Sequence, residues 1–418
     1  MNLLEVKLRD FDPEVNAIIR EEMVRNEETI NLIASENYPP KSSMKAISSM
    51  LSGIYSEGYP GERWYRGLEN IDKLESLAIA RAKAIFGAEH ANVQALSGSN
   101  ANLAAYLSVL KLGDRILSMD IDAGGHLSHG AKANVVSKMF NVVQYGVDSA
   151  AGLLDYEAIR KQAVEMKPRL IVCGASAYPR TIDFSKFRAI ADEVGAFLLA
   201  DISHIAGMVA VGLHPSPVPH CDLVTTTTHK TLRMTRGALI LCKASLADKV
   251  DRAVFPNLQG GPHQANIAAI AVGLKHLTAP EYVQYMRSVV ENARVLAEAL
   301  QKEGAEIATG GTDNHLLLLD LKGQGLDGET ASVLLEEANI IVNKNKIPGD
   351  RGTAKKPSGI RLGTPAVCTR GMGAEEVRRI AGWVMKVLSK PGDAAVRQSV
   401  RQEVIELCRA FPIYRMTF

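Results

Sequence analysis

One lysine ends a run of residues that favours an extended strand. The run is Val224-Thr225-Thr226-Thr227-Thr228-His229-Lys230-Thr231, and valine and threonine are enriched in strands. In an open sheet of parallel strands, ligands bind where the strands end. A lysine there can act as a nucleophile if it is partly desolvated or close to other cations. His229, Arg233 and Arg236 could fill that role and also bind a phosphate. A lone lysine in this setting is otherwise a solvated surface residue.

An aspartate ends a second apolar strand earlier in the chain. The strand is Phe197-Leu198-Leu199-Ala200-Asp201. Pyridoxal 5'-phosphate needs a carboxylate that keeps its pyridine nitrogen protonated, so that the ring withdraws electrons from a substrate carbanion. Asp201 and Lys230 together therefore predict a site for this cofactor. By itself, an aspartate at this place is more often a turn or cap residue.

A short loop of small residues, Ser97-Gly98-Ser99, stands between an apolar strand and a helix. Small residues let backbone N–H groups approach an anion, and the start of a helix adds a favourable field. The loop lacks the GKS of a P-loop and the GxGxxG of a dinucleotide site. It is a weak signal alone, and it disfavours a nucleotide ligand.

The elements that must position these residues alternate along the chain. Apolar segments of four to seven residues are separated by helical patterns, which indicates a mostly parallel sheet covered on both faces. Strands are predicted at 91–96, 115–119, 142–146, 170–174, 197–200, 223–227 and 238–241. Helices are predicted to begin at Asp12-Pro13 and to cover 70–86 (ending at Gly87), 100–112 and 184–194.

The remaining chain predicts an arm and a second unit. Residues 262–286 form a long helical connection, followed by strands at 306–308, 315–321, 340–342 and 359–362 and helices at 328–338, 374–389 and 394–410. We therefore expect an N-terminal helical arm (1–52), a large α/β domain that binds the cofactor (53–285) and a smaller C-terminal α+β domain (286–418).

Composition excludes several classes of protein. The net charge of +2 gives no overall basis for binding nucleic acid. No apolar stretch is long enough to span a bilayer, and the N-terminus lacks the pattern of a secretory signal. The five cysteines are scattered without CxxC spacing, which argues against a zinc site or a disulfide framework. We expect a cytoplasmic protein without a metal.

Several longer motifs resemble the serine hydroxymethyltransferase family, in the order that the family has them. They lie between about residues 30 and 370, and chance agreement over so many is negligible. The motifs are Asn31-Leu32-Ile33-Ala34-Ser35-Glu36-Asn37-Tyr38, Glu57-Gly58-Tyr59-Pro60-Gly61, Gly124-Gly125-His126-Leu127-Ser128-His129-Gly130, the run that ends in Lys230, Gln259-Gly260-Gly261-Pro262, Gly311-Thr312-Asp313-Asn314-His315, Val342-Asn343-Lys344-Asn345, and Ser358-Gly359-Ile360-Arg361-Leu362-Gly363-Thr364-Pro365.

The resemblance implies a fold-type I pyridoxal-phosphate transferase with a seven-stranded sheet, working as a homodimer or a pair of dimers. Lys230 would carry the cofactor as a Schiff base, Asp201 would pair with the pyridine nitrogen, and His126 would stack on the ring. Ser176 and His204 would lie near the ring hydroxyl. The phosphate would be bound by Ser97, Gly98, Ser99 and His229, and, from the neighbouring subunit, by Tyr55, Gly260 and Gly261.

The same resemblance implies roles at the amino acid and the folate. Arg361 would clamp the substrate carboxylate, a bidentate task suited to guanidinium, with help from Ser35. Glu57 would transfer a proton at the hydroxymethyl group or at the one-carbon unit of tetrahydrofolate, with Tyr65 nearby. Without the motif, Glu57 would read as a surface residue of a loop. The pterin would contact Gly125, Leu127 and Asn345, and Phe255 of the neighbouring subunit.

The match breaks in the loops around the one-carbon acceptor. Met234-Thr235 stands where the family usually has glycine-proline, and Ala238 replaces a second glycine. Because proline fixes φ and glycine permits unusual backbone angles, we expect a different path for this loop. Further replacements of a family residue occur at Arg66, Asn257 and Ser203.

Three functions follow from these observations. The first is interconversion of serine and glycine with tetrahydrofolate. The second is a folate-independent aldolase or transaldolase of β-hydroxy amino acids, or an α-methylserine enzyme, on the same scaffold; activity on threonine without folate would favour it. The third is a non-catalytic relative. The presence of Lys230, Asp201 and Arg361 argues against it, whereas the absence of a yellow cofactor from the purified protein would support it.

Overall fold

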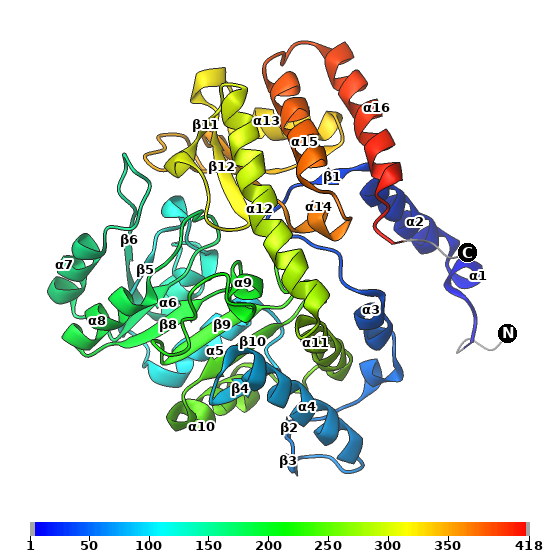
Figure 1. Ribbon diagram of the computed structural model, residues 1–418. Helices are drawn as coiled ribbons and strands as arrows, with labels where there is room; N and C mark the ends of the chain where they lie inside the picture. Colours follow the sequence, from blue (N-terminus) through cyan, green and yellow to red (C-terminus); the bar gives the residue numbers. More distant parts are fainter. Residues whose placement is uncertain (1–4, 415–418) are drawn as a thin grey trace.

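The structure is a computed structural model that describes residues 5–414. At its centre lies a seven-stranded sheet in the order β4-β10-β9-β8-β7-β5-β6 (Figure 1). Its strands are β4 (His90–Asn92), β5 (Arg115–Met119), β6 (Asn141–Tyr145), β7 (Leu170–Cys173), β8 (Phe197–Asp201), β9 (Leu223–Thr227) and β10 (Ala238–Cys242). Neighbours run parallel except at β10, which is antiparallel to β9 and to β4. The predicted α/β fold with a mostly parallel seven-stranded sheet is confirmed.

Helices cover both faces of this sheet. Side chains alternate between the two faces along each strand, so adjacent residues pack against different helices. On β8, Leu198 packs in the cluster that includes α4 (Glu69–Phe86) and α8 (Phe184–Val194). Leu199 belongs to the opposite cluster, with α5 (Gly98–Val109) and α10 (Ala247–Arg252). Leu198 and Leu199 are both fully buried. The continuous apolar character of the strands therefore reflects a sheet that is covered on both sides.

Some predicted boundaries were wrong. The strand predicted at 91–96 ends at Asn92, whose side chain accepts a hydrogen bond from the Gln94 backbone N–H (2.9 Å) and turns the chain out of the ladder. The helix predicted from residue 100 begins at Gly98 with Ser97 as its cap. The single helical region predicted at 262–286 is two helices, α11 (Gln264–Leu277) and α12 (Pro280–Lys302), since Pro280 begins the second.

A second sheet lies beyond α12. It is antiparallel throughout, in the order β11-β12-β15-β14, and β14 was not predicted. Its strands are β11 (Glu306–Ile307), β12 (Leu316–Asp320), β14 (Asn343–Asn345) and β15 (Gly359–Gly363). The strand predicted at 340–342 is β13 (Ile340–Ile341), which pairs instead with β1 (Ile30–Asn31) near the N-terminus. Helices α13 (Gly328–Glu337), α15 (Ala374–Leu388) and α16 (Ala394–Ala410) complete this apolar core.

Helix α12 contributes to two cores. Its first half, including Met286 and Val289, packs with the large sheet, and its second half, including Leu296 and Leu300, packs with the second sheet. The division into units at 53–285 and 286–418 stays a prediction. The shorter helices are α1 (Leu8–Phe11), α3 (Lys41–Ile47), α6 (Val136–Met139), α7 (Tyr156–Met166), α9 (Ala206–Ala210) and α14 (Pro365–Thr369).

The N-terminal arm carries an uncovered apolar face. Helix α2 (Pro13–Glu28) begins where predicted, with the Asp12 carboxylate accepting from the Val15 N–H (2.9 Å). None of its residues is buried, and Ile18 is 64% exposed. The helix lies beside α16 at the edge of the molecule (Figure 1). Among residues 5–414, no helix is long and apolar enough to cross a membrane.

Candidate active site

Lys230 lies just beyond the carboxyl end of β9, where the strand pattern predicted it. Its side chain is buried and its Nζ donates to Thr227 Oγ1 (3.1 Å). The Asn37 side-chain amide donates to the Lys230 backbone carbonyl (2.9 Å) and fixes the main chain. Burial lowers the pKa of Lys230 to about 8, although the nearby charge of Asp201 opposes this. The amine is therefore partly neutral near physiological pH and can act as a nucleophile.

Asp201 ends the neighbouring strand β8, and its carboxylate is held by three donors. These are the Asn102 amide (2.8 Å), His129 Nε2 (3.1 Å) and the Ser203 backbone N–H (3.0 Å). Burial alone would raise the pKa of this carboxyl, but hydrogen bonding to His129 and the surrounding charges hold it below its ordinary value. Asp201 therefore stays negative and can hold a protonated ring nitrogen.

A hydrogen-bonded chain links Asp201 to His126. The Asn102 amide also donates to Ser128 Oγ (2.8 Å), which lies 2.8 Å from His126 Nδ1. Burial lowers the pKa of His126 to about 4, so its ring is neutral and suited to stacking. No pattern in the sequence had predicted a role for Asn102, His129 or Ser128. The motif around His126 contains two of them, and Asn102 follows the Ser97-Gly98-Ser99 loop by one helical turn.

The start of α5 forms an anion-sized cradle next to β9. A Cβ added to Gly98 would lie 2.7 Å from Thr227 Cγ2, so only glycine fits there. Ser97 caps the helix, and Ser99 stands in its first turn. His229 Nδ1 is buried and has no partner in the described part of the chain, and burial lowers the pKa of His229 to about 3. The other N–H groups at the start of the helix and an unpartnered imidazole suit a phosphate.

Arg361 is a buried cation without a carboxylate partner among residues 5–414. It projects from β15, donating through Nε to Asn343 Oδ1 (3.0 Å) and through Nη1 to the Ser176 carbonyl (2.6 Å). Burial lowers its pKa to about 10. Ser35 follows Ala34, whose atoms pack against Gly363 at the end of the same strand. A desolvated guanidinium with unused N–H groups is suited to the carboxylate of a small molecule.

A pair of buried histidines lies close enough to Lys230 and Arg361 for both charges to act on it. His204 Nδ1 and His315 Nε2 are 3.2 Å apart, and the rings are stacked. Burial, followed by the charges of Lys230 and Arg361, lowers the pKa of His204. His315 ends the Gly311-Thr312-Asp313-Asn314-His315 motif and was not among the predicted site residues. Because one nitrogen of this pair must donate to the other, the pair fixes which His204 nitrogen faces outward.

Five predicted residues form a second cluster. The rings of Tyr55 and Tyr65 meet edge to face at 5.5 Å, Glu57 Oε1 lies 3.2 Å from the Cβ position of Gly260, and the Tyr55 ring lies 3.6 Å from that of Gly261. Tyr55 is 63% exposed. Within the described residues, no hydrogen bond or ion pair joins this cluster to Lys230.

The residues predicted to contact the pterin occupy three different segments. Gly125 stands in a turn where a Cβ would collide with the Met119 carbonyl, and Leu127 is half exposed beside it. Asn345 donates to the Lys346 carbonyl (2.6 Å) at the end of β14. Phe255 is half-buried and close to the glycines of the second cluster in sequence. Their contact with a ligand stays a prediction.

The loop after Lys230, in which Met234-Thr235 stands where the family usually has glycine-proline, is well packed. Arg233 adopts a positive φ of 55° and its guanidinium lies 4.2 Å from the centre of the Tyr285 ring. Met234 is buried against Gly273, where a Cβ would collide with it. The Met234 N–H donates to the Thr228 carbonyl (3.0 Å), and Thr228 Oγ1 donates to the Thr235 carbonyl (2.6 Å). The loop thus keeps a defined path without the glycine-proline pair.

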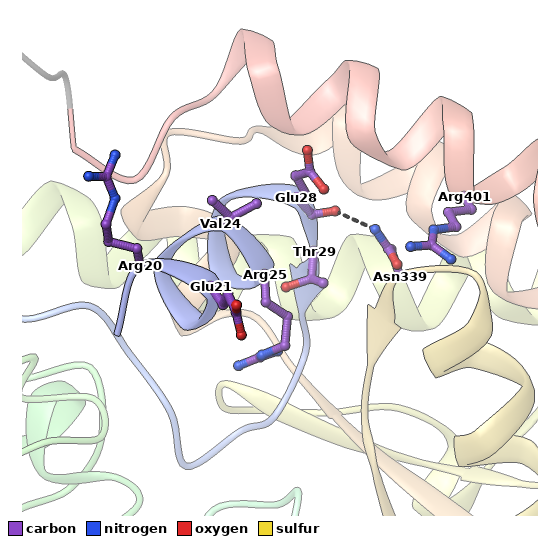
Figure 2. A pocket seen from close by; sticks show the side chains of 8 residues that line it. All are labelled: Arg20, Glu21, Val24, Arg25, Glu28, Thr29, Asn339 and Arg401. Carbon is purple, nitrogen blue, oxygen red and sulfur yellow. Dashed lines mark hydrogen bonds between the residues drawn. The ribbon is translucent and has the colours of Figure 1, made fainter. Parts of the chain in front are cut away.

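Other hollows of the surface are separate from these residues. Figure 2 shows one of about 420 Å³ between α2 and the chain near Asn339, lined by Arg20, Glu21, Val24, Arg25, Glu28, Thr29, Asn339 and Arg401. None of the predicted site residues lines it. In the part of the chain that is described, no three His, Cys, Asp or Glu side chains are placed to hold a metal ion.

Comparison with known proteins agrees with this geometry. A family model described as "Serine hydroxymethyltransferase" matches residues 8–384. A protein of Dehalococcoides mccartyi is 49% identical over 407 residues, covering 97% of this chain and 98% of that protein. A protein of Desulfotalea psychrophila is 50% identical over 405 residues, covering 97% and 95%. Both bear the name serine hydroxymethyltransferase.

Proposed function

Because the chain belongs to the serine hydroxymethyltransferase family, we propose that it interconverts serine and glycine, with tetrahydrofolate accepting and donating the one-carbon unit. The observation that carries the proposal is Arg361. It is buried without a carboxylate partner in residues 5–414, and it is close enough to Lys230 to lower the pKa of that amine. A site that offers a reactive amine and a free guanidinium matches an amino acid substrate. Nothing in the comparisons favours the folate-independent alternative.

The residues around Lys230 fit pyridoxal 5'-phosphate, the family's cofactor. Gly98 leaves room beside Thr227, and His229 offers a buried, unpartnered nitrogen. Together with Ser97 and Ser99, these residues would hold the phosphate. When bound, the cofactor supplies an aldehyde that takes the substrate amine and a ring that withdraws electrons from the breaking bond.

The chain's own groups then orient the substrate and move protons. Lys230 holds or releases a proton at Nζ, which its lowered pKa permits near neutrality. Asp201, held negative by its donors, would pair with the ring nitrogen of the bound cofactor and favour its protonated form. Arg361 aligns the substrate carboxylate with the help of Ser35, which fixes the bond that breaks relative to the ring.

Three further residues would frame the ring. His126 would stack on it, while Ser176 and His204 would lie near its hydroxyl group. The neutral state of both histidines, which follows from burial, suits hydrogen bonding and stacking rather than charge pairing.

The second cluster would complete the site from a second copy of the chain. Tyr55, Gly260 and Gly261 would reach the phosphate across the interface, which is consistent with the lack of a hydrogen bond between them and Lys230 among the described residues of one chain. Glu57 would move a proton at the serine hydroxymethyl oxygen or at the one-carbon unit of the folate, with Tyr65 beside it. The protein would therefore act as a homodimer or a pair of dimers.

The pterin would be held by Gly125, Leu127 and Asn345, together with Phe255 of the second copy.

We also propose a cytoplasmic location, in keeping with the five cysteines, which are all unpaired. For the chain's organisation we propose an arm (1–52), a cofactor-binding domain (53–285) and a smaller domain (286–418).

The test is cleavage of serine by the purified, cofactor-loaded protein, with and without tetrahydrofolate, and with threonine as a competing substrate. Strong dependence on folate with serine is the expected result. Turnover that does not depend on folate, or a preference for threonine, would contradict the proposal and assign the altered loops to a different acceptor.

A further inference from the structure

Glu57 directly precedes a hairpin that is too short to fix the position of its side chain by itself. The hairpin pairs β2 (Gly58–Tyr59) with β3 (Glu62–Arg63), two residues on each side. An isolated two-stranded hairpin is only marginally stable, and a proton-transfer group must be placed within a fraction of an ångström to be effective. Other contacts must therefore fix Glu57.

Arg63 supplies the first of these contacts. Its side chain is 4% exposed, and its Nη1 donates to the carbonyls of Ser56 (2.8 Å) and Gly58 (2.7 Å), which flank Glu57 on both sides. The Glu57 carbonyl itself accepts from the Trp64 N–H (3.1 Å). Three consecutive carbonyls around the candidate acid are thus hydrogen-bonded to one arm of the hairpin.

A buried carboxylate, Glu75 on α4, anchors this arginine to the core. Glu75 is fully buried and accepts from Arg63 Nη2 (2.7 Å), while Asp72 accepts from Arg63 Nε (2.8 Å). Two glutamines complete its shell: Gln94 donates to Oε1 (2.7 Å) and Gln264 donates to Oε2 (3.2 Å).

The same two glutamines also reach the residues beside Glu57. Gln94 Nε2 donates to the Gly58 carbonyl (3.0 Å), and Gln264 Nε2 donates to Ser56 Oγ (2.9 Å). Their own side-chain oxygens are buried and have no partner within the described residues. Unpartnered buried oxygens are unfavourable, and an apolar core would avoid them. The two glutamines therefore direct their amide N–H groups to Glu75 and to the residues beside Glu57, at the cost of two buried oxygens without partners.

We propose that Glu75, acting through Arg63, Gln94 and Gln264, is the positioning residue that fixes Glu57 for proton transfer. The inference rests on the proposed role of Glu57 and adds the device that sets its geometry. Glu75 touches neither substrate nor cofactor. Its removal should therefore change the rate of the step that uses Glu57 and leave the Lys230 site intact.

The first experiment compares Glu75→Gln with Glu62→Gln in the cofactor-loaded protein. Glu62 is an exposed carboxylate of the same hairpin whose side chain has no partner in the described chain, so it controls for loss of charge. Glu75→Gln should lower kcat for folate-dependent serine cleavage by about 30- to 100-fold, with KM for serine changed by less than about threefold. Glu62→Gln should leave both unchanged.

A second readout separates positioning from general damage. Exchange of the glycine Cα proton with solvent uses the cofactor site but involves no hydroxymethyl group. In Glu75→Gln its rate should stay within about threefold of the parent. An equal loss in both reactions would overturn the proposal. If Glu75→Gln folds poorly, Gln94→Met provides the test: it removes the amide that donates to both Glu75 and the Gly58 carbonyl, together with an unpartnered oxygen, and should lower kcat for serine cleavage about 5- to 10-fold while glycine exchange stays within about threefold of the parent.

A double-mutant cycle with Glu57→Gln decides the route of the effect. If Glu75 acts through Glu57, Glu75→Gln should add little to the loss already caused by Glu57→Gln. Losses that multiply would overturn the positioning role. So would serine turnover that is lost in Glu57→Gln but kept in Glu75→Gln. Unchanged turnover in Glu57→Gln would instead overturn the acid–base assignment in the proposed function.

Discussion

At the scale of single residues, the chemistry depends on pKa values that burial and hydrogen bonding have moved away from their ordinary range. Lys230 is made a better nucleophile by the loss of water around its amine, and Asp201 is kept negative by His129 and Asn102. Arg361 remains charged in a buried place because two oxygens accept its N–H groups. A buried charge is costly unless hydrogen bonds or an opposite charge compensate for the lost water, and each of these residues has polar neighbours.

The lowered pKa of Lys230 predicts how the apoprotein reacts with pH. Only the neutral amine attacks an aldehyde, and with a pKa of about 8 its fraction rises as the pH passes from 7 to 9. The rate of capture of pyridoxal 5'-phosphate, followed by absorbance, should therefore increase with a midpoint near pH 8. A midpoint near that of an ordinary lysine would contradict this, and Lys230→Ala should show neither the capture nor any turnover.

Replacement of Arg361 should weaken amino acid binding and spare the cofactor. Arg361→Ala removes the guanidinium proposed to bind the substrate carboxylate, so the affinity for glycine should fall by about a hundredfold or more. The affinity for pyridoxal 5'-phosphate should stay within about threefold. Titration of the cofactor absorbance with glycine measures both. Arg378→Ala, at an exposed arginine of α15, is the control. Unchanged glycine affinity in Arg361→Ala would show that the carboxylate binds elsewhere.

At the scale of elements, two strands and one helix start create the cofactor site. Asp201 pairs in register with Thr225 across β8 and β9, so the carboxylate and Lys230 leave the same edge of the sheet. The start of α5 comes close enough to β9 that a side chain at Gly98 has no room. Short strands and a close-packed helix start together set the width of the site.

Gly98→Ala tests that close approach. The added Cβ would lie 2.7 Å from Thr227 Cγ2, so helix and strand must separate. We expect a loss of about 1–3 kcal/mol in the free energy of unfolding and about tenfold weaker cofactor binding. Thermal unfolding and dialysis against buffer without cofactor would measure these. Gly382→Ala, where nothing lies within 4 Å of the added carbon, should instead be neutral or slightly stabilising.

At the scale of the whole molecule, the proposed sharing of each active site between two copies predicts that activity requires two chains. Within the described residues of one chain, no hydrogen bond or ion pair joins Glu57 or Tyr55 to Lys230, and α2 leaves Ile18 and Met23 exposed. A symmetric dimer would complete the proposed site and would cover an apolar face of this kind.

Mixing two inactive variants tests this directly. Co-expression of Lys230→Ala with Glu57→Gln should restore activity, because a mixed dimer contains one site with both residues intact. Random pairing of equal amounts should give about one quarter of the parent activity per dimer. Each variant expressed alone provides the baseline. No recovery in purified mixed dimers would mean that each site is built from a single chain.

The sequence by itself determined the fold class and the position of most elements, and it predicted the residues that would carry the chemistry. Strands β5 and β9 and helices α8 and α16 lie at the predicted residues, because their apolar period, caps and glycines are local signals. Motifs likewise placed Lys230, Asp201 and Arg361 without knowledge of their surroundings.

Only the tertiary structure decided which residues support them. Asn102, His129, His315 and Asn343 hold the reactive groups from other segments, and β14 and the β1–β13 pair join parts of the chain that no local pattern connects. Glu75 reads in the sequence as one more acidic residue of an amphipathic helix, yet it is fully buried against Arg63. Hydrogen bonds between distant segments are set by how the layers pack, and a single sequence does not contain that spacing.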